Sequence, residues 1–399
     1  MKLQNRRLSA ILLLLLLLLI NSSALLLAQS LEIKAGDDAV KISPIGRIYI
    51  DGAAFVQDQS DLSNGVKIPD IRLGLAAGYK QWTSKIDIGF GNGKVSAKDI
   101  FLQYNFSKTS YLRAGHYKEP FGMDRLDSSG KIKFMTPNAA SNAFTPGRRI
   151  GLSYVGTADM LWFSGGLFGD ANSISAGKDG DDGYAATGRL VFNPLKKQGA
   201  ILHFGLAATV RKADANGREI VDGVLQDNAR TVSYSSSLPS HIDNIKPLAS
   251  SISNADYEAK YAVELLAALG PVSFQSEYFH TNVKRYEHAP TYQAMGAYGQ
   301  VGVLLTGGNY AYSVANALLD KVAAGSLEVV GRFNYTDLDH RGSAIYGGKM
   351  RDWSLAANYY LNKYIMFRLN YSYINMGNYN PALAGENVHA IQGRIQVTF

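Results

Sequence analysis

Apolar and polar residues alternate one by one along most of the chain after residue 30. Such period-two segments indicate β-strands with two chemically different faces. Most of these segments have ten or more residues, which suits a tilted strand crossing a bilayer better than a strand of a globular sandwich. We predict sixteen strands, at 45–57, 68–80, 82–91, 95–106, 109–118, 148–157, 160–169, 184–193, 199–211, 257–269, 271–282, 291–306, 326–337, 349–361, 364–375 and 387–399.

The segments between these strands alternate between short and long. Every second connection is a short turn, as at 80–81, and the longest of the others are 119–147 and 212–256. This parity is typical of a transmembrane barrel with short inner turns and longer outer loops. One inner connection, 307–325, is too long for a tight turn, and one outer connection, 91–94, is unusually short.

The last predicted strand shows the alternation most clearly. One face carries Ile391, Ile395, Val397 and Phe399, and the other carries Gln392, Arg394, Gln396 and Thr398. An apolar face towards lipid and a polar face towards a wet lumen explain this arrangement, although a half-buried soluble strand would alternate in the same way. The aromatic residue at the end favours the membrane, because aromatic rings gather at its interfaces. We therefore expect an all-β, transmembrane antiparallel barrel.

The N-terminus resembles an export signal. Three basic residues precede an almost pure leucine run at 11–20, and small and polar residues follow it. The run is too short to span a hydrocarbon layer of about 30 Å as a helix. A tilted anchor that extends to Ala28 is the alternative. We expect cleavage after Ala24 or Ala28, and divide the chain into a signal peptide at 1–28, a lead-in at 29–44 and a barrel at 45–399.

Composition and charge fit an exported barrel. The 399 residues include 24 Tyr, 40 Gly and no Cys, and the absence of Cys excludes a disulfide framework and Cys-based metal sites. The formal charge is +7, of which three positive charges lie in the signal, so the mature chain carries 37 − 33 = +4. A basic balance favours nucleic acid, anionic lipid or anionic solutes as partners. For an exported chain, anionic solutes are the natural candidates and nucleic acid is not expected.

Several motifs, in a specific order, carry a family resemblance that covers nearly all of 45–399. They are IRLG at 71–74 with Trp82 and Lys85, VSAKD at 95–99, RAGHYKEPFG at 113–122, AFTPGRRIG at 143–151, VLLTGG at 303–308, Trp353 to Tyr360 with LNKY at 361–364, and RIQVTF at 394–399. Together they resemble the phosphate-selective porin O and P family of the bacterial outer membrane.

The resemblance implies a sixteen-stranded barrel, a homotrimer in the outer membrane of a Gram-negative-type bacterium, and passive passage of small solutes. It also implies that the third outer loop, here 119–147, folds into the lumen as a constriction. By the same resemblance, the long outer loop 212–256 and the inner connection 307–325 dip inward as well.

Basic residues on the polar faces and in the third loop are the candidate pore-lining and anion-binding groups. Guanidinium groups suit oxyanions because their planar fork donates two charge-assisted hydrogen bonds. Basic side chains are also costly on the lipid face, which favours the inward assignment. The candidates are Arg47, Arg72, Lys85, Lys118, Arg125, Lys131, Lys133, Arg148, Arg149, Arg332, Arg368 and Arg394.

The alternative is that these cations pair with acids of the wall and only stabilise it. The acids in question are Asp51, Asp70, Asp87, Asp99, Glu264, Glu277 and Glu328. We expect an anion-preferring pore, with phosphate as the more specific option, and a non-selective or plugged structural or adhesive barrel as the runner-up. An enzyme is disfavoured, because the chain has no Gly-x-Ser-x-Gly motif and its seven His are scattered. We expect no catalytic residues, no metal and no cofactor.

Overall fold

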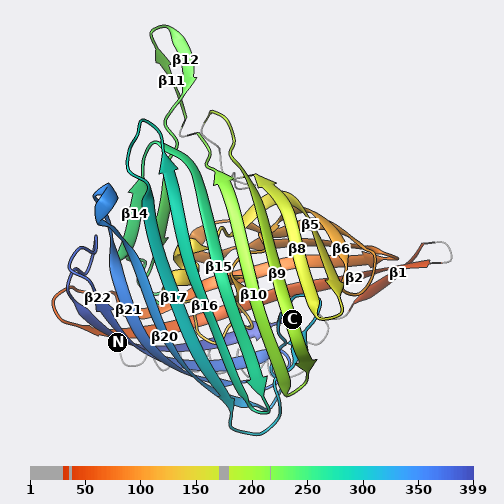
Figure 1. The fold of residues 1–399 in the computed structure, drawn as a ribbon. Helices are drawn as coiled ribbons and strands as arrows, with labels where there is room; N and C mark the ends of the chain where they lie inside the picture. Colours follow the sequence, from red (N-terminus) through yellow and green to blue (C-terminus); the bar gives the residue numbers. More distant parts are fainter. Residues whose placement is uncertain (1–29, 36–37, 170–178, 216) are drawn as a thin grey trace.

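The computed structural model describes residues 30–35, 38–169, 179–215 and 217–399. Its antiparallel main sheet closes into a barrel (Figure 1). The sheet has 17 strands, but β1 (Leu31–Ala35) pairs only with β2, which leaves sixteen in the ring. These are β2 (Asp38–Gln57), β3 (Gly65–Tyr79), β4 (Trp82–Gly89), β5 (Ser96–Asn105), β6 (Tyr111–Lys118), β7 (Arg148–Ala158), β8 (Leu161–Gly169), β9 (Tyr184–Lys197), β10 (Ala200–Lys212), β15 (Ala255–Leu269), β16 (Val272–Arg285), β17 (Tyr292–Leu304), β20 (Leu327–His340), β21 (Ile345–Tyr359), β22 (Ile365–Met376) and β23 (Asn387–Thr398). The predicted fold class is therefore confirmed.

The first and last ring strands close the barrel. β2 pairs with β23 from Arg47 opposite Thr398 to Gln57 opposite Val388. Beyond this ladder, the backbones of Gly46 and Phe399 exchange two hydrogen bonds of 3.0 Å. The Phe399 ring lies where a Cβ atom at residue 46 would stand. Glycine at position 46 therefore leaves the space that the Phe399 ring occupies.

Each of the sixteen predicted strands coincides with one strand of the ring, and the differences lie at the ends. The lead-in is largely extended, because 38–44 belongs to β2 and pairs with β3. The predicted outer loop 338–348 shrinks to 341–344, since both neighbouring strands run further. The expected signal peptide at 1–28 lies outside the described residues. Among the described residues, no helix is both long and apolar enough to cross a membrane.

The ring strands have an apolar outer face and a more polar inner face. In β10, the side chains of Phe204 and Leu206 are 47% and 58% exposed on the outside. On the inner face of the same strand, His203, Thr209 and Arg211 are almost fully buried. This distribution is the reverse of a soluble protein and is the one that lipid requires of a barrel.

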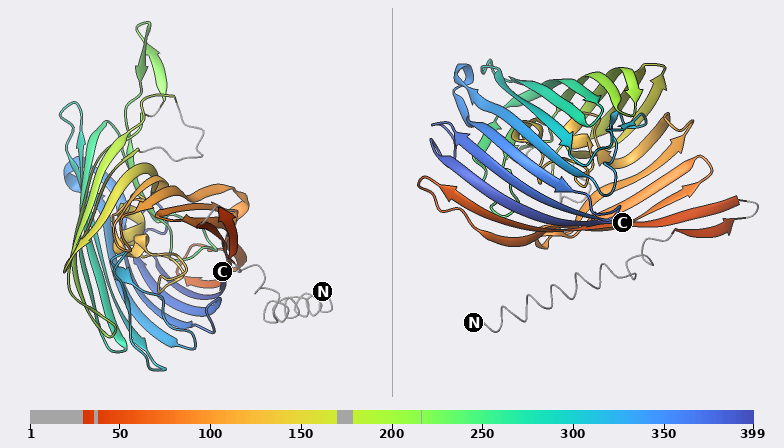
Figure 2. Two further views of the ribbon diagram at one scale, coloured as in Figure 1. Left: turned by 90° about the vertical axis from the view of Figure 1, so that its right-hand side faces the viewer. Right: turned by 90° about the horizontal axis from the view of Figure 1, so that it is seen from below.

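Three connections pack against the inner face of the wall. The connection 119–147 contains α3 (Met123–Leu126) and α4 (Ala139–Phe144) (Figure 2). The connection 213–254 contains β13 (Val232–Ser236) and β14 (Leu248–Ile252), and 305–326 contains β18 (Tyr312–Ser313) and β19 (Leu318–Leu319). The hairpin of β11 (Arg218–Val221) and β12 (Val224–Asp227) projects beyond the barrel instead (Figure 1). Two single 3-10 turns, η1 (Gly91–Gly93) and η2 (Arg341–Ser343), complete the described elements.

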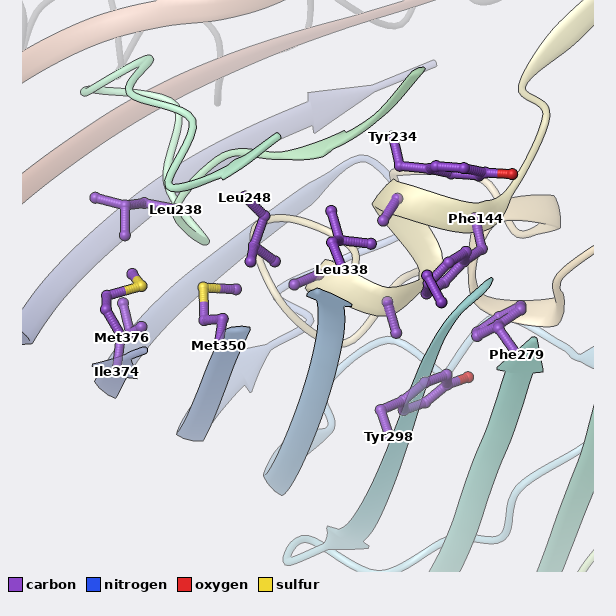
Figure 3. Close-up of a cluster of buried hydrophobic side chains, with 14 of the residues drawn as sticks. Phe144, Tyr234, Leu238, Leu248, Phe279, Tyr298, Leu338, Met350, Ile374 and Met376 are labelled. Atoms are coloured by element: carbon purple, nitrogen blue, oxygen red, sulfur yellow. The ribbon is translucent and has the colours of Figure 1, made fainter. Parts of the chain in front are cut away.

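A buried apolar cluster joins two of these connections, 119–147 and 213–254, to one side of the barrel (Figure 3). Phe144 of α4 stacks on Phe279 of β16, with ring centroids 6.1 Å apart, and contacts Tyr234 of β13 at 5.7 Å. Leu248 of β14 and Ile374 of β22 belong to the same cluster, and neither has measurable exposure. Because apolar packing of this kind excludes water, it fills the lumen beside β16–β22.

Candidate functional site

Two cavities lie between the segment 119–147 and the wall formed by β2–β7. The larger measures about 500 Å³ and also reaches β8, β9 and the connection 305–326. The smaller measures about 340 Å³ and lies beside the ends of β5, β6 and β7 that face the segment 119–147. The residues that line both cavities are Lys98, Lys118, Arg125, Leu126 and Arg148. Four of these five are basic, and we call the four the junction cations.

Two junction cations are placed by the strands that flank the segment 119–147. Lys118 ends β6, Arg148 begins β7, and the two residues are paired directly across the ladder. Like charges opposite one another in a sheet repel, so each needs its own partners. Arg148 donates to Asp99 Oδ1 at 2.7 Å. Lys118 Nζ donates at 2.6 Å to two backbone carbonyls of the loop, those of Arg125 and Asp127.

A β-bulge brings Lys98 to the junction. In the ladder between β4 and β5, Ile86 pairs with Ile100 but Ile88 pairs with Ala97, so two residues of β5 oppose one of β4. A bulge redirects a side chain that regular alternation would send to the other face. Lys98 and its neighbour Asp99 therefore both line the larger cavity. The Lys98 stem passes over Gly89, at the place that a Cβ atom would occupy.

Charged side chains form a continuous chain of ion pairs across β2–β5 and β7. Its order is Arg47, Asp70, Arg72, Asp87, Lys85, Asp99 and Arg148. The contacts range from 2.6 Å between Arg47 and Asp70 to 3.8 Å between Lys85 and Asp87. Four cations share three acids in this chain. The acids hold the cations in place and cancel most of their charge.

Three of the junction cations do not take part in this chain of ion pairs. Within the described part of the chain, Lys98, Lys118 and Arg125 form no ion pair with a carboxylate. Arg125 has a long hydrogen bond of 3.3 Å to the side-chain oxygen of Asn142. Arg113, in the larger cavity, likewise has no carboxylate partner among the described residues; it donates to Gln103 and lies over the rings of Phe101 and Tyr111. The lining charge that no described carboxylate pairs with therefore lies on three of the junction cations and on Arg113.

The lining as a whole is positive. The larger cavity is lined by nine Lys and Arg residues and five Asp residues, which gives 9 − 5 = +4 when all are ionised. Two of the acids lie in the segment 119–147. Burial raises the pKa of the Asp127 carboxyl to about 6, and burial also raises the pKa of Asp124 above its usual value. Protonation of Asp127 below pH 6 therefore makes the lining more positive still.

The family model of the phosphate-selective porins O and P matches residues 46–399. The chain belongs to this family. The resemblance seen in the sequence is thus confirmed, and the protein is an outer-membrane porin. Members of the family are channels rather than enzymes. A comparison with curated proteins gave no match.

Solved porin structures share the fold of this porin at low sequence identity. OmpT of Vibrio cholerae is 12% identical, with a TM-score of 0.57 over 92% of this chain and 100% of that one. The anion-selective porin from Comamonas acidovorans is 12% identical, with a TM-score of 0.55 over 90% of this chain and 100% of that one. The outer membrane channel DcaP of Acinetobacter baumannii is 13% identical, with a TM-score of 0.53 over 92% and 99%.

The twelve basic residues predicted from the sequence fall into two groups in this porin. Seven line the cavities: Arg47, Arg72, Lys85, Lys118, Arg125, Arg148 and Arg149. Five do not line either of them: Lys131, Lys133, Arg332, Arg368 and Arg394.

Three residues of the second group have acidic partners. Lys131 pairs with Asp320 at 3.1 Å and Lys133 with Glu328 at 2.5 Å. Arg394 donates two hydrogen bonds of 2.6 Å to Asp51. The acid-pairing alternative thus describes part of the wall. Glu277, one of the acids expected to pair, instead accepts hydrogen bonds from the backbone N–H groups of Met123 and Asp124.

Sequence reasoning missed Lys98, Arg113 and Arg189 as lining residues. Arg113 was within reach of the alternation rule, because Leu112 on one side is exposed to lipid and Arg113 must then face inward. Lys98 could not be assigned by the alternation rule, because a β-bulge inserts one residue into the period of two and has no clear signature in the sequence.

Proposed function

We propose that this porin passes small anions in preference to cations, through the two cavities beside β2–β7. One observation carries the proposal: four of the five residues shared by the two cavities are basic. Three of these cations are not neutralised by a described carboxylate. A permeating ion that moves from one cavity to the other meets them at close range. Like-charged cations are repelled there and anions are attracted.

The arrangement also favours release of the anion. Conduction requires that binding be strong enough to admit an ion and weak enough to let it leave. Arg47, Arg72, Lys85 and Arg148 are held by acids on the wall and offer only partial charge. Such a series of moderate sites lets an anion move stepwise beyond the junction. Phosphate is a natural solute for paired guanidinium and ammonium donors, and the family description points the same way.

Recording from single channels in a planar bilayer tests this proposal. With a potassium chloride gradient across the membrane, we expect a reversal potential that reports anion preference. Phosphate added on one side should reduce the chloride current if it occupies the junction. A cation-selective reversal potential would refute the anion preference, and unaffected chloride current would refute phosphate as a preferred solute.

A plugged structural barrel is the second candidate, because the buried cluster around Phe144 and Phe279 fills part of the lumen. A purified protein that inserts into bilayers but never conducts would favour it. We further propose export by the segment 1–28 and assembly as a homotrimer, the state named for one OmpT structure of Vibrio cholerae. N-terminal sequencing of the mature protein and its mass in native detergent solution test these two points.

A further inference from the structure

We propose that Arg368 and Arg332 are positioning residues that clamp the segment 119–147 to the wall, and that neither meets the permeating ion. This inference rests on the proposed function and assigns these arginines a role different from the anion-binding one expected from alternation. Both face the lumen, but they are only 3% and 4% exposed. Neither lines either of the two cavities.

Arg368 of β22 is fully engaged with the loop. Its Nη1 donates to the carbonyl of Phe134 at 2.5 Å, and its Nη2 donates to the carbonyl of Ile132 at 2.6 Å. Its Nε donates to Asn358 Oδ1 at 2.7 Å. A guanidinium group has five donors in a fixed plane; here two nitrogens donate to the backbone of the segment and the third donates to a side chain of β21. With only 3% of the residue exposed, an oxyanion has no access to the fork.

Neighbouring wall residues take the adjacent carbonyls of the same stretch. Asn358 donates to the carbonyl of Lys133 at 2.9 Å, and Gln396 donates to that of Gly130 at 3.0 Å. Arg332 donates to the carbonyl of Thr136 at 3.3 Å and covers the ring of Phe134, 4.0 Å from its centroid. The residues 130–136 belong to no strand or helix. Buried carbonyls outside regular structure need partners, and β20–β23 supply them from side chains.

Two further contacts fix the helices on either side of this stretch. Glu277 of β16 accepts hydrogen bonds from the first backbone N–H groups of α3, at Met123 and Asp124. Asn334 of β20 accepts one from Ala140 in α4 at 3.2 Å. One side of the segment is therefore tied to β16–β23, while Arg125 on the other side lines the passage. The position of that junction cation depends on the clamp.

Loss of charge and loss of the clamp have different consequences. Without the Arg368 guanidinium, two buried carbonyls lose their donors, and the stretch 130–136 should move away from the wall. We expect a variant with Met at this position to show a more mobile segment, a larger size limit and a weaker anion preference. If Arg368 were an ion site, the same variant would lose anion preference while the segment and the size limit stayed as they are.

A spin label and a permeation assay separate the two cases. The chain has no cysteine, so Ser128→Cys provides one exposed attachment point on the segment. Because Ser128 lines the larger cavity, the label serves the mobility measurement only, and permeation is measured without this substitution. Nitroxide mobility is measured by electron paramagnetic resonance, uptake of neutral sugars of increasing size by liposome swelling, and reversal potential in bilayers. Lys98→Met is the matched control, because it removes one positive charge from the lining of both cavities. We expect Arg368→Met to raise mobility and the size limit, and Lys98→Met to change only the reversal potential.

Arg368→Lys keeps the charge and is the gentler variant if Arg368→Met does not assemble. An ammonium lacks the planar fork of a guanidinium group and cannot reproduce all three hydrogen bonds to Phe134, Ile132 and Asn358, so label mobility should still rise. Wild-type mobility and sugar uptake in both Arg368 variants, together with a shifted reversal potential, would overturn the clamp. A wild-type porin without anion preference would refute the proposed function, while the label and swelling measurements would still decide the role of Arg368.

Discussion

Replacing Lys98 by methionine tests the junction most directly. The side chain lines both cavities and forms no ion pair with a described carboxylate. Methionine retains an unbranched stem of similar length. The substitution therefore removes one positive charge from the lining that the two cavities share and leaves the barrel wall in place.

The expected size of the effect follows from Coulomb's law. Two unit charges about 4 Å apart interact by about 1 kcal/mol in a water-like medium. Both the attraction of an anion and the repulsion of a cation are lost, so the permeability ratio changes by about twice that energy before screening. With screening lengths of about 10 Å at 0.1 M salt and about 3 Å at 1 M, the change falls to about 1.3 and about 0.5 kcal/mol. These values correspond to about tenfold and about twofold changes in the ratio.

Reversal potentials in salt gradients centred on the two concentrations provide the assay. Lys363→Met is the matched control, because Lys363 is exposed and lines neither cavity. We expect Lys98→Met to lower the anion-to-cation permeability ratio strongly in dilute salt and weakly in concentrated salt, and the control to leave it unchanged. An anion-selective wild type whose ratio is insensitive to Lys98→Met at 0.1 M would refute the reasoning.

Three further predictions use the same porin. Gly89→Ala places a methyl group where the Lys98 stem now lies, so reversal potentials should show a smaller loss of anion preference than Lys98→Met, with conductance retained. Arg394→Met leaves the buried Asp51 without its bidentate partner, which should cost about 3–5 kcal/mol of unfolding free energy; urea unfolding in vesicles measures it, and adding Asp51→Asn should recover part. Burial raises the pKa of Asp127 to about 6, so its carboxylate becomes neutral as the pH falls from 7 to 5. Anion preference should then increase, and a pH series of reversal potentials in Asp127→Asn should lack this rise.

The strands were predictable because lipid imposes a uniform rule on their outer faces. Every second side chain must be apolar wherever the wall meets the membrane, and this made all sixteen strands visible in the sequence. The ends of the strands are not under that rule. Residues 38–44 and 345–348 extend beyond their predicted boundaries for this reason, because ladder pairing continues there without a lipid-facing pattern.

The lining of the two cavities was only partly predictable. Alternation identifies the residues that face inward, but it does not identify which of them face a cavity and which are covered by a loop. Arg72 and Arg368 both occupy inward positions on regular strands. Arg72 meets a cavity, whereas Arg368 meets the backbone of residues 132–134. The loop lies against this side of the wall through contacts between residues far apart in sequence, such as Phe144 with Phe279 and Phe134 with Arg368. Non-local packing of this kind leaves no local sequence pattern.

Under the proposed function, anion preference in this porin depends on the position of the unpaired charge rather than on the number of basic residues. The guanidinium group of Arg368, buried behind the loop, donates to backbone carbonyls of the loop instead of to water. A buried charge must be surrounded by dipoles or a counter-ion, and these hydrogen bonds hold the loop in place. An arginine on the open wall is shared with Asp70, Asp87 or Asp99 and contributes little net field. What remains besides Arg113 is the small set at the junction, where Lys98, Lys118 and Arg125 line the cavities without an acidic partner in the described structure. A different structural feature places each of them: a β-bulge places Lys98, the end of β6 places Lys118, and the short loop helix α3 places Arg125.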